Sequence, residues 1–403
     1  MNIAIIANLY KELSGNASGG TELFSFLLAE ELASRNSIHH IDVYGVGKNN
    51  FRSPKISFIN VLETEISSFI DSNSILIDIV KDRPYLSDEL QNNLIAKTYK
   101  LLTLKNYKII HNNSTSSLFH SLAYLQAFET MQTPIITTLH TNLSSPSIII
   151  PYLLNLIKSN SNYFFVPIAD HQVRYAKKHS LNIPLTAPIY NGIKIYEYSY
   201  NENTPQKSYG LWIGRISKKH NKGLKEALLT TNALDIPFTV VITIDDKKFY
   251  DEEIQPLIHK NVQLYTTSIT PEKKAELYKN AGYFIYPIMW EEPFGLIFLE
   301  AMVSGTPVIA YAKGAVPEII KDGETGFIVN SSEDDVRGDF IIKKTGIEGL
   351  CEGVKRIHDM TEKEYKIMRN ACHNHVEKNF TIQHMVDEYE ELYTNIINHG
   401  KIV

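Results

Sequence analysis

The chain has 403 residues, more than one hydrophobic core usually organises, so we expect two domains. Hydrophobic residues make up 43% of the sequence and charged residues 21%, which excludes a chain dominated by disorder. The formal net charge of −5 excludes a global basic field that would recruit nucleic acid. The two cysteines, Cys351 and Cys372, are typical of a reducing cytosol and not of a disulfide framework.

The N-terminus reads MNIAIIANLY and lacks the basic flank and long apolar region of a signal peptide, so it is interpreted as a buried strand. No stretch reaches the roughly 18 uninterrupted apolar residues that a membrane helix needs. We therefore expect a cytoplasmic protein that binds no nucleic acid, and we leave peripheral membrane contact open.

The first half of the chain alternates short apolar runs with longer amphipathic stretches. Helices are expected at 22–34 and 117–128, and strands at 3–7, 41–44, 74–79, 109–110, 135–139 and 163–168. Strands followed by helices at this rhythm predict a parallel sheet that is covered on both faces.

A second series of the same kind has strands expected at 209–216, 238–244, 262–267, 283–288, 306–311 and 325–329. The polar, tyrosine-rich segment 191–207 is typical of an exposed connection, so we place a domain boundary at Thr204. Both domains are therefore predicted to be α/β, with ligands at the carboxyl ends of their parallel strands. Two such sheets facing one another would leave a deep cleft.

Two later segments are harder to interpret. The final stretch, 381–397, carries one helical stripe of apolar residues: Met385, Tyr389, Leu392, Tyr393 and Ile396. Periodicity alone leaves open whether this helix covers the second domain or packs elsewhere. Segment 330–346 is charged and loop-like, and its sequence indicates no function.

Residues 290–310 read WEEPFGLIFLEAMVSGTPVIA and place two carboxylates on either side of a Pro-Phe-Gly turn. The proline disfavours helix at the residue before it, so Glu292 is expected on a loop, while Gly295 opens a helix. The amides of Phe294, Gly295 and Leu296 would then be unpaired donors at a positive helix end. A glycine there lets a phosphate approach, which predicts a diphosphate site.

Glu300 lies roughly 7 to 8 Å beyond Gly295 along the helix axis, at 1.5 Å per residue. With Glu292 it would bracket the diphosphate site, and each carboxylate could accept paired hydroxyls from one end of a nucleotide sugar. A helix glutamate is more often solvated or a complement to the helix dipole. The residues around Glu300 are apolar, however, so we expect its carboxylate to be partly buried and to need partners.

A basic loop follows the first strand of the second series, in GLWIGRISKKHNKGLKEAL (210–228). Arg215 is expected at the carboxyl edge of the sheet, and Lys218, Lys219 and Lys222 follow on the loop. Two cations there would stabilise a departing nucleoside diphosphate without a metal. A basic loop by itself is more often a solvated face.

Two features of the first half would allow a ligand to approach closely. Gly19 and Gly20 precede an amphipathic helix, where small residues let the backbone come near a diphosphate or sugar, although turns use glycine pairs everywhere. His140 ends the strand at 134–140, where a lone histidine is usually only a satisfied polar residue.

Residues 290–329 read WEEPFGLIFLEAMVSGTPVIAYAKGAVPEIIKDGETGFIV and resemble the C-terminal signature of retaining glycosyltransferases of the family-4 type (GT4), in the UDP-sugar-using branch with WEEPFGL. The match includes the Glu-x7-Glu pattern and the flanking Gly-Thr-Pro-Val-Ile and Pro-Glu segments. This resemblance implies a GT-B fold, with two Rossmann-like domains facing a central cleft. It further implies an acceptor-binding domain at 1–203, a nucleotide-sugar-binding domain at 204–379, and a C-terminal helix at 380–403 that crosses back to the first domain.

In the second domain, the resemblance implies that Glu292 contacts the donor hexose and Glu300 the nucleotide ribose. It implies Arg215 and Lys222 as the phosphate clamp. Because the spacing is slightly long, Lys219 is a possible substitute for Lys222.

In the first domain, the resemblance implies that the loop of Gly19 and Gly20 reaches the donor diphosphate and helps to shape the acceptor pocket. It implies that His140 contacts the donor sugar. The sequence departs from the family where Thr141 follows this histidine, and where Thr243, Ile244 and Asp245 fill the space in which related sequences commonly have a glycine after a strand. The adjacent aspartates at 245 and 246 lack the spacing of an Asp-x-Asp metal site, so no metal is expected.

The resemblance implies transfer of a hexose, with retention and without a metal or cofactor, from a nucleoside diphosphate sugar to an acceptor hydroxyl. UDP-glucose or a related UDP-hexose is the preferred donor, with GDP-sugars open. The acceptor is unknown and is a small molecule, a lipid-linked molecule or a glycan. Alternatives are a nucleotide-sugar-binding protein that has lost transfer, which the retained Arg215, Lys222 and Glu292 oppose, and a UDP-sugar 2-epimerase, which the Glu-x7-Glu segment opposes.

Overall fold

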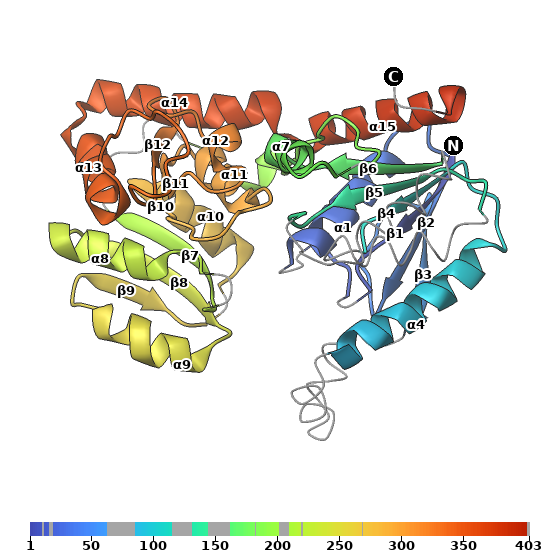
Figure 1. The fold of residues 1–403 in the computed structure, drawn as a ribbon, viewed down its shortest axis with the longest axis horizontal. Helices are drawn as coiled ribbons and strands as arrows, with labels where there is room; N and C mark the ends of the chain where they lie inside the picture. Colours follow the sequence, from blue (N-terminus) through green and yellow to red (C-terminus); the bar gives the residue numbers. More distant parts are fainter. Residues whose placement is uncertain are drawn as a thin grey trace. The chain divides into compact units, whose positions relative to one another are not determined.

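The structure, a computed structural model, describes residues 1–9, 12–15, 19–62, 85–114, 131–143, 162–181, 183–200, 209–218, 221–267 and 269–400, with the backbone alone for 85–92. By its internal contacts the chain divides into two compact units, Met1–Asn191 with Ile382–Val403, and Gly192–Thr381. Within the described residues, each unit contains a parallel sheet of six strands (Figure 1). The predicted α/β fold with two parallel sheets is confirmed.

The sheet of the first unit is wound in two directions from its centre. Its strands are β1 (Asn2–Ile6), β2 (His40–Val46), β3 (Ile56–Leu62), β4 (Ile109–Asn112), β5 (Ile135–Leu139) and β6 (Tyr163–Pro167). They lie in the order β3-β2-β1-β4-β5-β6, and neighbours pair in parallel. The winding therefore reverses between β1 and β4. Open α/β sheets bind ligands at such a switch point, outside the carboxyl ends of the strands.

The C-terminal helix belongs to the first unit, as predicted. The helices of this unit are α1 (Gly20–Ala33), α4 (Tyr85–Leu102), α7 (Asp170–Lys178) and α15 (Ile382–His399). The predicted stripe of α15 enters the same core cluster as α1, with Leu392 partly buried and the others fully buried. The Tyr393 hydroxyl also lies 2.5 Å from Nδ1 of His111, the buried histidine on β4.

The sheet of the second unit repeats this winding. Its strands are β7 (Gly210–Ile216), β8 (Phe238–Ile244), β9 (Val262–Tyr265), β10 (Tyr283–Ile285), β11 (Val308–Tyr311) and β12 (Gly326–Val329). They lie in the order β12-β11-β10-β7-β8-β9, again in parallel, so the switch point falls between β7 and β10.

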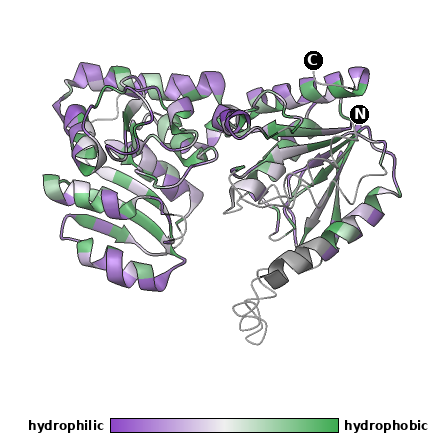
Figure 2. Cartoon of the chain, in the orientation of Figure 1, coloured by the Kyte–Doolittle hydropathy of each residue, from purple (hydrophilic) through white to green (hydrophobic). Residues whose placement is uncertain are grey.

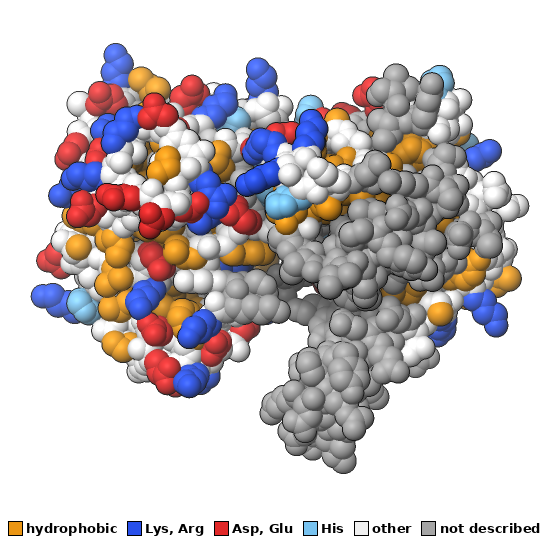
Figure 3. All heavy atoms as spheres, viewed as in Figure 1, with side chains coloured by type: hydrophobic (Ala, Val, Ile, Leu, Met, Phe, Trp, Pro, Cys, Tyr) orange, Lys and Arg blue, Asp and Glu red, His pale blue; other side chains and the backbone are white. Residues whose placement is uncertain are grey.

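Helices connect these strands and cover the sheet. They are α8 (Leu224–Leu234), α9 (Lys247–Phe249), α10 (Pro271–Asn280), α11 (Leu296–Val303), α12 (Val316–Ile319), α13 (Gly346–Asp359) and α14 (Glu362–Asn379), with short 3₁₀ or π turns at Ile195–Glu197, Tyr250–Ile254 and Gln255–Leu257. Hydrophobic residues concentrate on the strands and hydrophilic ones along the helices (Figure 2). Charges of both signs are interspersed on the face of this unit that Figure 3 shows.

Some expectations differ from the structure or lie outside it. The strand expected at 74–79, the helix expected at 117–128 and the boundary at Thr204 fall outside the described residues. The contacts divide the chain earlier, after Asn191. Strand β3 was not predicted; it is a half-exposed edge strand in which only Val61 is fully buried.

Candidate functional site

The predicted residues of the second unit lie on elements that meet at its switch point. Arg215 lies near the carboxyl end of β7, and Lys222 lies on the loop that leads into α8. Glu292 lies on the loop between β10 and α11, and Glu300 lies within α11. Because β7 and β10 are adjacent and parallel, both loops leave the same edge of the sheet.

A glycine in the left-handed region opens α11. Gly295 has φ +94°, and a Cβ there would lie 2.5 Å from the ring of Phe298 and 3.2 Å from Cγ of Glu292. Among the described residues no side chain caps this helix end. The N–H of Phe298 donates to the Gly295 carbonyl at 3.0 Å, whereas helix geometry leaves the N–H of Leu296, the first residue of the helix, without an intrahelical acceptor.

Of the three backbone amides that the sequence predicted to be free donors, the amide of Phe294 is already hydrogen-bonded. The backbone N–H of Phe294 donates a hydrogen bond to the Glu292 carboxylate. The Glu292 side chain, two residues earlier, can reach forward to this amide in the turn that the intervening proline favours. The free anion-binding donors expected here are therefore those of Gly295 and Leu296.

The loop places the Glu292 carboxyl in a sheltered environment. Burial raises the pKa of this carboxyl, while the charge of Lys222 and the Phe294 amide act to lower it. The Glu292 carbonyl accepts a hydrogen bond of 2.9 Å from the N–H of Ala315. A Cβ on Gly314 would lie 2.1 Å from that carbonyl oxygen, so the two loops pack backbone against backbone.

Glu300 is buried and paired, as its apolar surroundings predict. Its residue is 7% exposed, and Nζ of Lys274 lies 2.7 Å from its carboxylate. The hydroxyl of Tyr278 donates at 3.2 Å, and Tyr198 adds a further hydrogen bond. Burial also raises the pKa of Tyr286, and the charges of both Glu300 and Glu292 add to this effect.

Asp245, which directly follows β8, pairs with Arg215, the arginine that the sequence resemblance assigns to the diphosphate. Nη1 of Arg215 lies 3.3 and 3.4 Å from the two carboxylate oxygens of Asp245. Both side chains are about two-fifths exposed, at 42% and 40%. The sequence located the departure at Asp245, but it gave no signal for this pairing.

The loop of Lys222 is fastened to the segment that leads to Glu292. Gly223 has φ +76°, and a Cβ there would lie 2.0 Å from the carbonyl oxygen of Pro287. The carbonyl of Asn221 accepts from the N–H of Met289 at 3.0 Å. These contacts hold Lys222 near Glu292; Lys219 lies outside the described residues.

In the first unit, polar residues follow three adjacent strands at their carboxyl ends. Asn8 follows β1, Asn113 follows β4 and His140 follows β5. Nε2 of His140 donates to the amide oxygen of Asn113 at 3.2 Å, and burial lowers the pKa of this histidine to about 3. The amide nitrogen of Asn113 is buried and has no partner among the described residues, which the sequence did not single out.

The two predicted glycines differ in their surroundings. A Cβ on Gly19 would lie 1.9 Å from one carboxylate oxygen of Glu22, and the other oxygen of that carboxylate accepts from the Asn8 side chain at 2.7 Å. Gly20, the first residue of α1, has open space at its Cβ position. A larger residue at 19 would therefore displace the end of the Glu22 side chain, whereas Gly20 leaves room for a side chain or a ligand.

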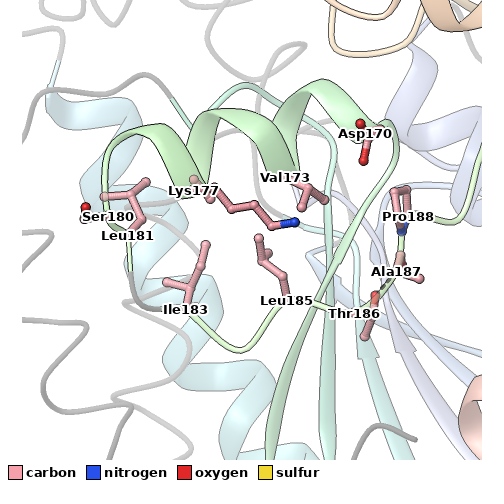
Figure 4. A pocket seen from close by; sticks show the side chains of 11 residues that line it. Asp170, Val173, Lys177, Ser180, Leu181, Ile183, Leu185, Thr186, Ala187 and Pro188 are labelled. Carbon is pink, nitrogen blue, oxygen red and sulfur yellow. Dashed lines mark hydrogen bonds between the residues drawn. The ribbon is translucent and has the colours of Figure 1, made fainter.

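A separate pocket of about 670 Å³ lies between α7 and the segment 180–188 (Figure 4). The side chain of Lys177 stretches across it, between α7 and that segment (Figure 4). None of the residues predicted from the sequence to form the site lines this pocket. The described helices include none that is long and apolar enough to span a membrane.

These features define a class of protein. Residues 201–343 match the family model described as glycosyl transferases group 1. The two sheets, with the same winding in each unit, match those of GT-B glycosyltransferases. The chain thus has a GT-B fold, and residues 201–343 are similar to the glycosyl transferases group 1 model.

Particular proteins share parts of this pattern. The chain is 26% identical to spore coat protein SA of Bacillus subtilis (strain 168) over 136 residues, 32% of this chain and 36% of that relative. The chain covers well under half of the length of the first curated relatives that it matches. Sucrose-phosphate synthase from Thermosynechococcus elongatus matches with a TM-score of 0.73 at 17% identity, covering 98% of this chain and 99% of the other. HepE from Anabaena, in complex with UDP-glucose, matches with a TM-score of 0.68 at 16% identity, covering 98% and 100%.

Proposed function

We propose that this chain is a retaining, metal-independent glycosyltransferase of the GT4 type. It transfers a hexose from a nucleoside diphosphate sugar, UDP-glucose or a related UDP-hexose, to an acceptor hydroxyl. The observation that carries the proposal is the convergence of Arg215, Lys222, Glu292 and the uncapped start of α11 at one switch point. The glycosyl transferases group 1 match over the same unit supports it, and the likeness to HepE with UDP-glucose supports the choice of donor.

The leaving diphosphate is held by cations and amides. Arg215 and Lys222 offset its growing charge, and the N–H groups of Gly295 and Leu296 donate to its oxygens at the positive end of α11. The two amides are fixed by the fold before the donor arrives, whereas Arg215 exchanges Asp245 for the diphosphate when the donor binds.

The two glutamates bind the ends of the donor. Glu292 accepts hydroxyls of the hexose, and Glu300 accepts a hydroxyl of the ribose. A carboxylate offers about four acceptor positions. Lys274, Tyr278 and Tyr198 occupy three positions on Glu300, which leaves one for the ribose.

Transfer needs no basic side chain from the protein. The leaving phosphate takes the acceptor proton on the same face of the sugar, which retains the anomeric configuration. Gly19, Gly20 and His140 of the first unit assist the donor in the roles that the family resemblance implies. His140 would act as a neutral hydrogen-bonding group, because burial lowers its pKa to about 3.

The proposal is tested by incubating the protein with UDP- and GDP-sugars and acceptor extracts. Mass spectrometry should reveal an acceptor that gains a hexose, and NMR of the product should show a retained anomeric configuration. EDTA should leave the rate unchanged. Glu292→Ala and Lys222→Ala should each remove most transfer, while Lys225→Ala, a lysine of α8 paired with Glu253, should retain it.

Two outcomes would overturn the proposal. The first is a free epimerised UDP-sugar without any transferred product. The second is wild-type turnover by both site variants, which would place the reaction elsewhere.

A further inference from the structure

Residues 330–338, in the charged segment whose sequence indicated no function, form a closed loop beside the candidate site. Asn330 follows β12 and is 7% exposed. Its side chain donates to the carbonyl of Gly338 at 3.0 Å and accepts from the N–H of Arg337 at 2.8 Å. One buried side chain thus joins the two ends of the loop and holds the residues between them in one arrangement.

Asp335 is the centre of this loop. It accepts hydrogen bonds from the Ser331 hydroxyl at 2.6 Å, from the Lys313 ammonium and from Nε of Arg337. Burial alone would raise the pKa of Asp335, but these three donors hold it well below its usual range. The side chains of Lys313 and Asp335 are only 13% and 24% exposed, so this pair is largely shielded from water.

A second nitrogen of the Arg337 guanidinium contacts the loop that carries Glu292, the residue proposed to bind the donor hexose. Nη2 of Arg337 lies 2.7 Å from one carboxylate oxygen of Glu291, whose other oxygen accepts the N–H of Gly314 at 2.7 Å. The next residue, Glu292, accepts the N–H of Ala315 through its carbonyl. The Glu291 side chain and the Glu292 carbonyl are therefore both anchored by hydrogen bonds.

We propose that Arg337 is a positioning residue for sugar recognition, acting through Glu291 to aim the Glu292 carboxylate at the donor hexose. This inference rests on the proposed function. The guanidinium suits the task because its planar fork bridges two carboxylates, those of Asp335 and Glu291, which a single ammonium cannot reproduce. The Arg337–Glu291 pair is exposed, at 41% and 40%, so it contributes little to folding. The pair acts instead on the orientation of the loop that carries Glu291 and Glu292.

The test compares two ligands by calorimetry on the full chain. UDP lacks the hexose that Glu292 is proposed to contact, and UDP-glucose carries it. Arg337→Met should weaken UDP-glucose binding by about three- to fivefold, the range that an exposed pair can supply, while it changes UDP affinity less than about twofold. Arg337→Lys should recover part of the loss. Lys343→Met, which breaks the exposed pair with Asp339, is the control and should bind both ligands as the wild type does.

Two further variants separate the possible failures. Glu291→Gln removes the partner of Arg337 and should give the same selective loss, even if Arg337→Met does not fold. Glu292→Gln is the reference for loss of the sugar contact. If it binds UDP-glucose like the wild type, the proposed function fails and the inference fails with it. If it loses UDP-glucose selectively while Arg337→Met and Glu291→Gln bind normally, or lose both ligands equally, the inference alone is overturned.

Discussion

Arg215 and Asp245 form an ion pair that competes with the proposed ligand. The proposed function assigns the arginine to the diphosphate, yet the structure pairs its guanidinium with a carboxylate at 3.3 Å. Exposed pairs of this kind are worth about 0.2–1 kcal/mol. The pair is thus weak enough for a diphosphate to displace, and it holds the guanidinium in place until the donor binds.

Asp245→Asn should therefore bind UDP more tightly, by up to about fivefold, because the competing charge is gone. Arg215→Ala should bind UDP on the order of ten- to a hundredfold more weakly, since hydrogen bonds to charged groups are worth about 1.5–3 kcal/mol. Asp251→Asn, which breaks the surface pair with Lys247, is a matched control. Titration calorimetry at low salt measures all three. Weaker binding by Asp245→Asn would mean that the aspartate supports the arginine.

At the scale of elements, α11 depends on the one residue that can open it. Gly295 combines a positive φ with a Cβ position only 2.5 Å from Phe298. Gly295→Ala should destabilise the protein by about 1–3 kcal/mol. That corresponds to on the order of 2–4 °C in Tm per kcal/mol for a unit of this size. Gly20→Ala, at open space on α1, should leave Tm unchanged or raise it. Equal thermal unfolding of the two variants would refute the strain at Gly295.

The histidine buried where α15 packs on β4 makes the free energy of unfolding depend on pH. Burial lowers the pKa of His111 to about 3, and its ring lies between Tyr393 and Thr138. An unfolded histidine titrates near 6.5, so between these values only the unfolded chain binds the proton. Stability should therefore fall as pH drops through this window, by about 1.4 kcal/mol per pH unit for this group.

His111→Gln should remove that contribution and flatten the dependence of the unfolding free energy on pH. Urea unfolding at pH 7, 6 and 5 measures the slope, which is compared between the variants instead of their absolute stabilities. A slope identical to that of the wild type would show that the buried ring titrates normally.

At the scale of the whole molecule, the alternation of strands and helices was predictable because most strands are buried on both faces and therefore read as continuous apolar runs. The half-exposed edge strand β3 lacks that signal and was missed, although β9, an edge strand with a similar burial pattern, was predicted. The pairing of Arg215 with Asp245 depends on the register of β7 against β8, which aligns Ile216 with Ile244. The pattern of a single sequence does not show which residues of two strands are paired. For the same reason it did not show the ion pair between Glu291 and Arg337, which are far apart in the chain.

The candidate residues themselves were recognised through local motifs, because turn chemistry acts over a few residues. The Pro-Phe-Gly turn predicted both the loop position of Glu292 and the start of α11. It did not reveal that the Phe294 amide is taken by that same glutamate, since this depends on a side-chain conformation.

The central claim is that the second unit holds a nucleoside diphosphate sugar at the switch point between β7 and β10. A crystal structure with bound UDP-glucose tests it most directly. The account predicts the diphosphate against the N–H groups of Gly295 and Leu296 and the cations of Arg215 and Lys222, with Glu292 on the hexose and Glu300 on the ribose. UDP-glucose bound away from the start of α11, with these side chains unchanged, would contradict it.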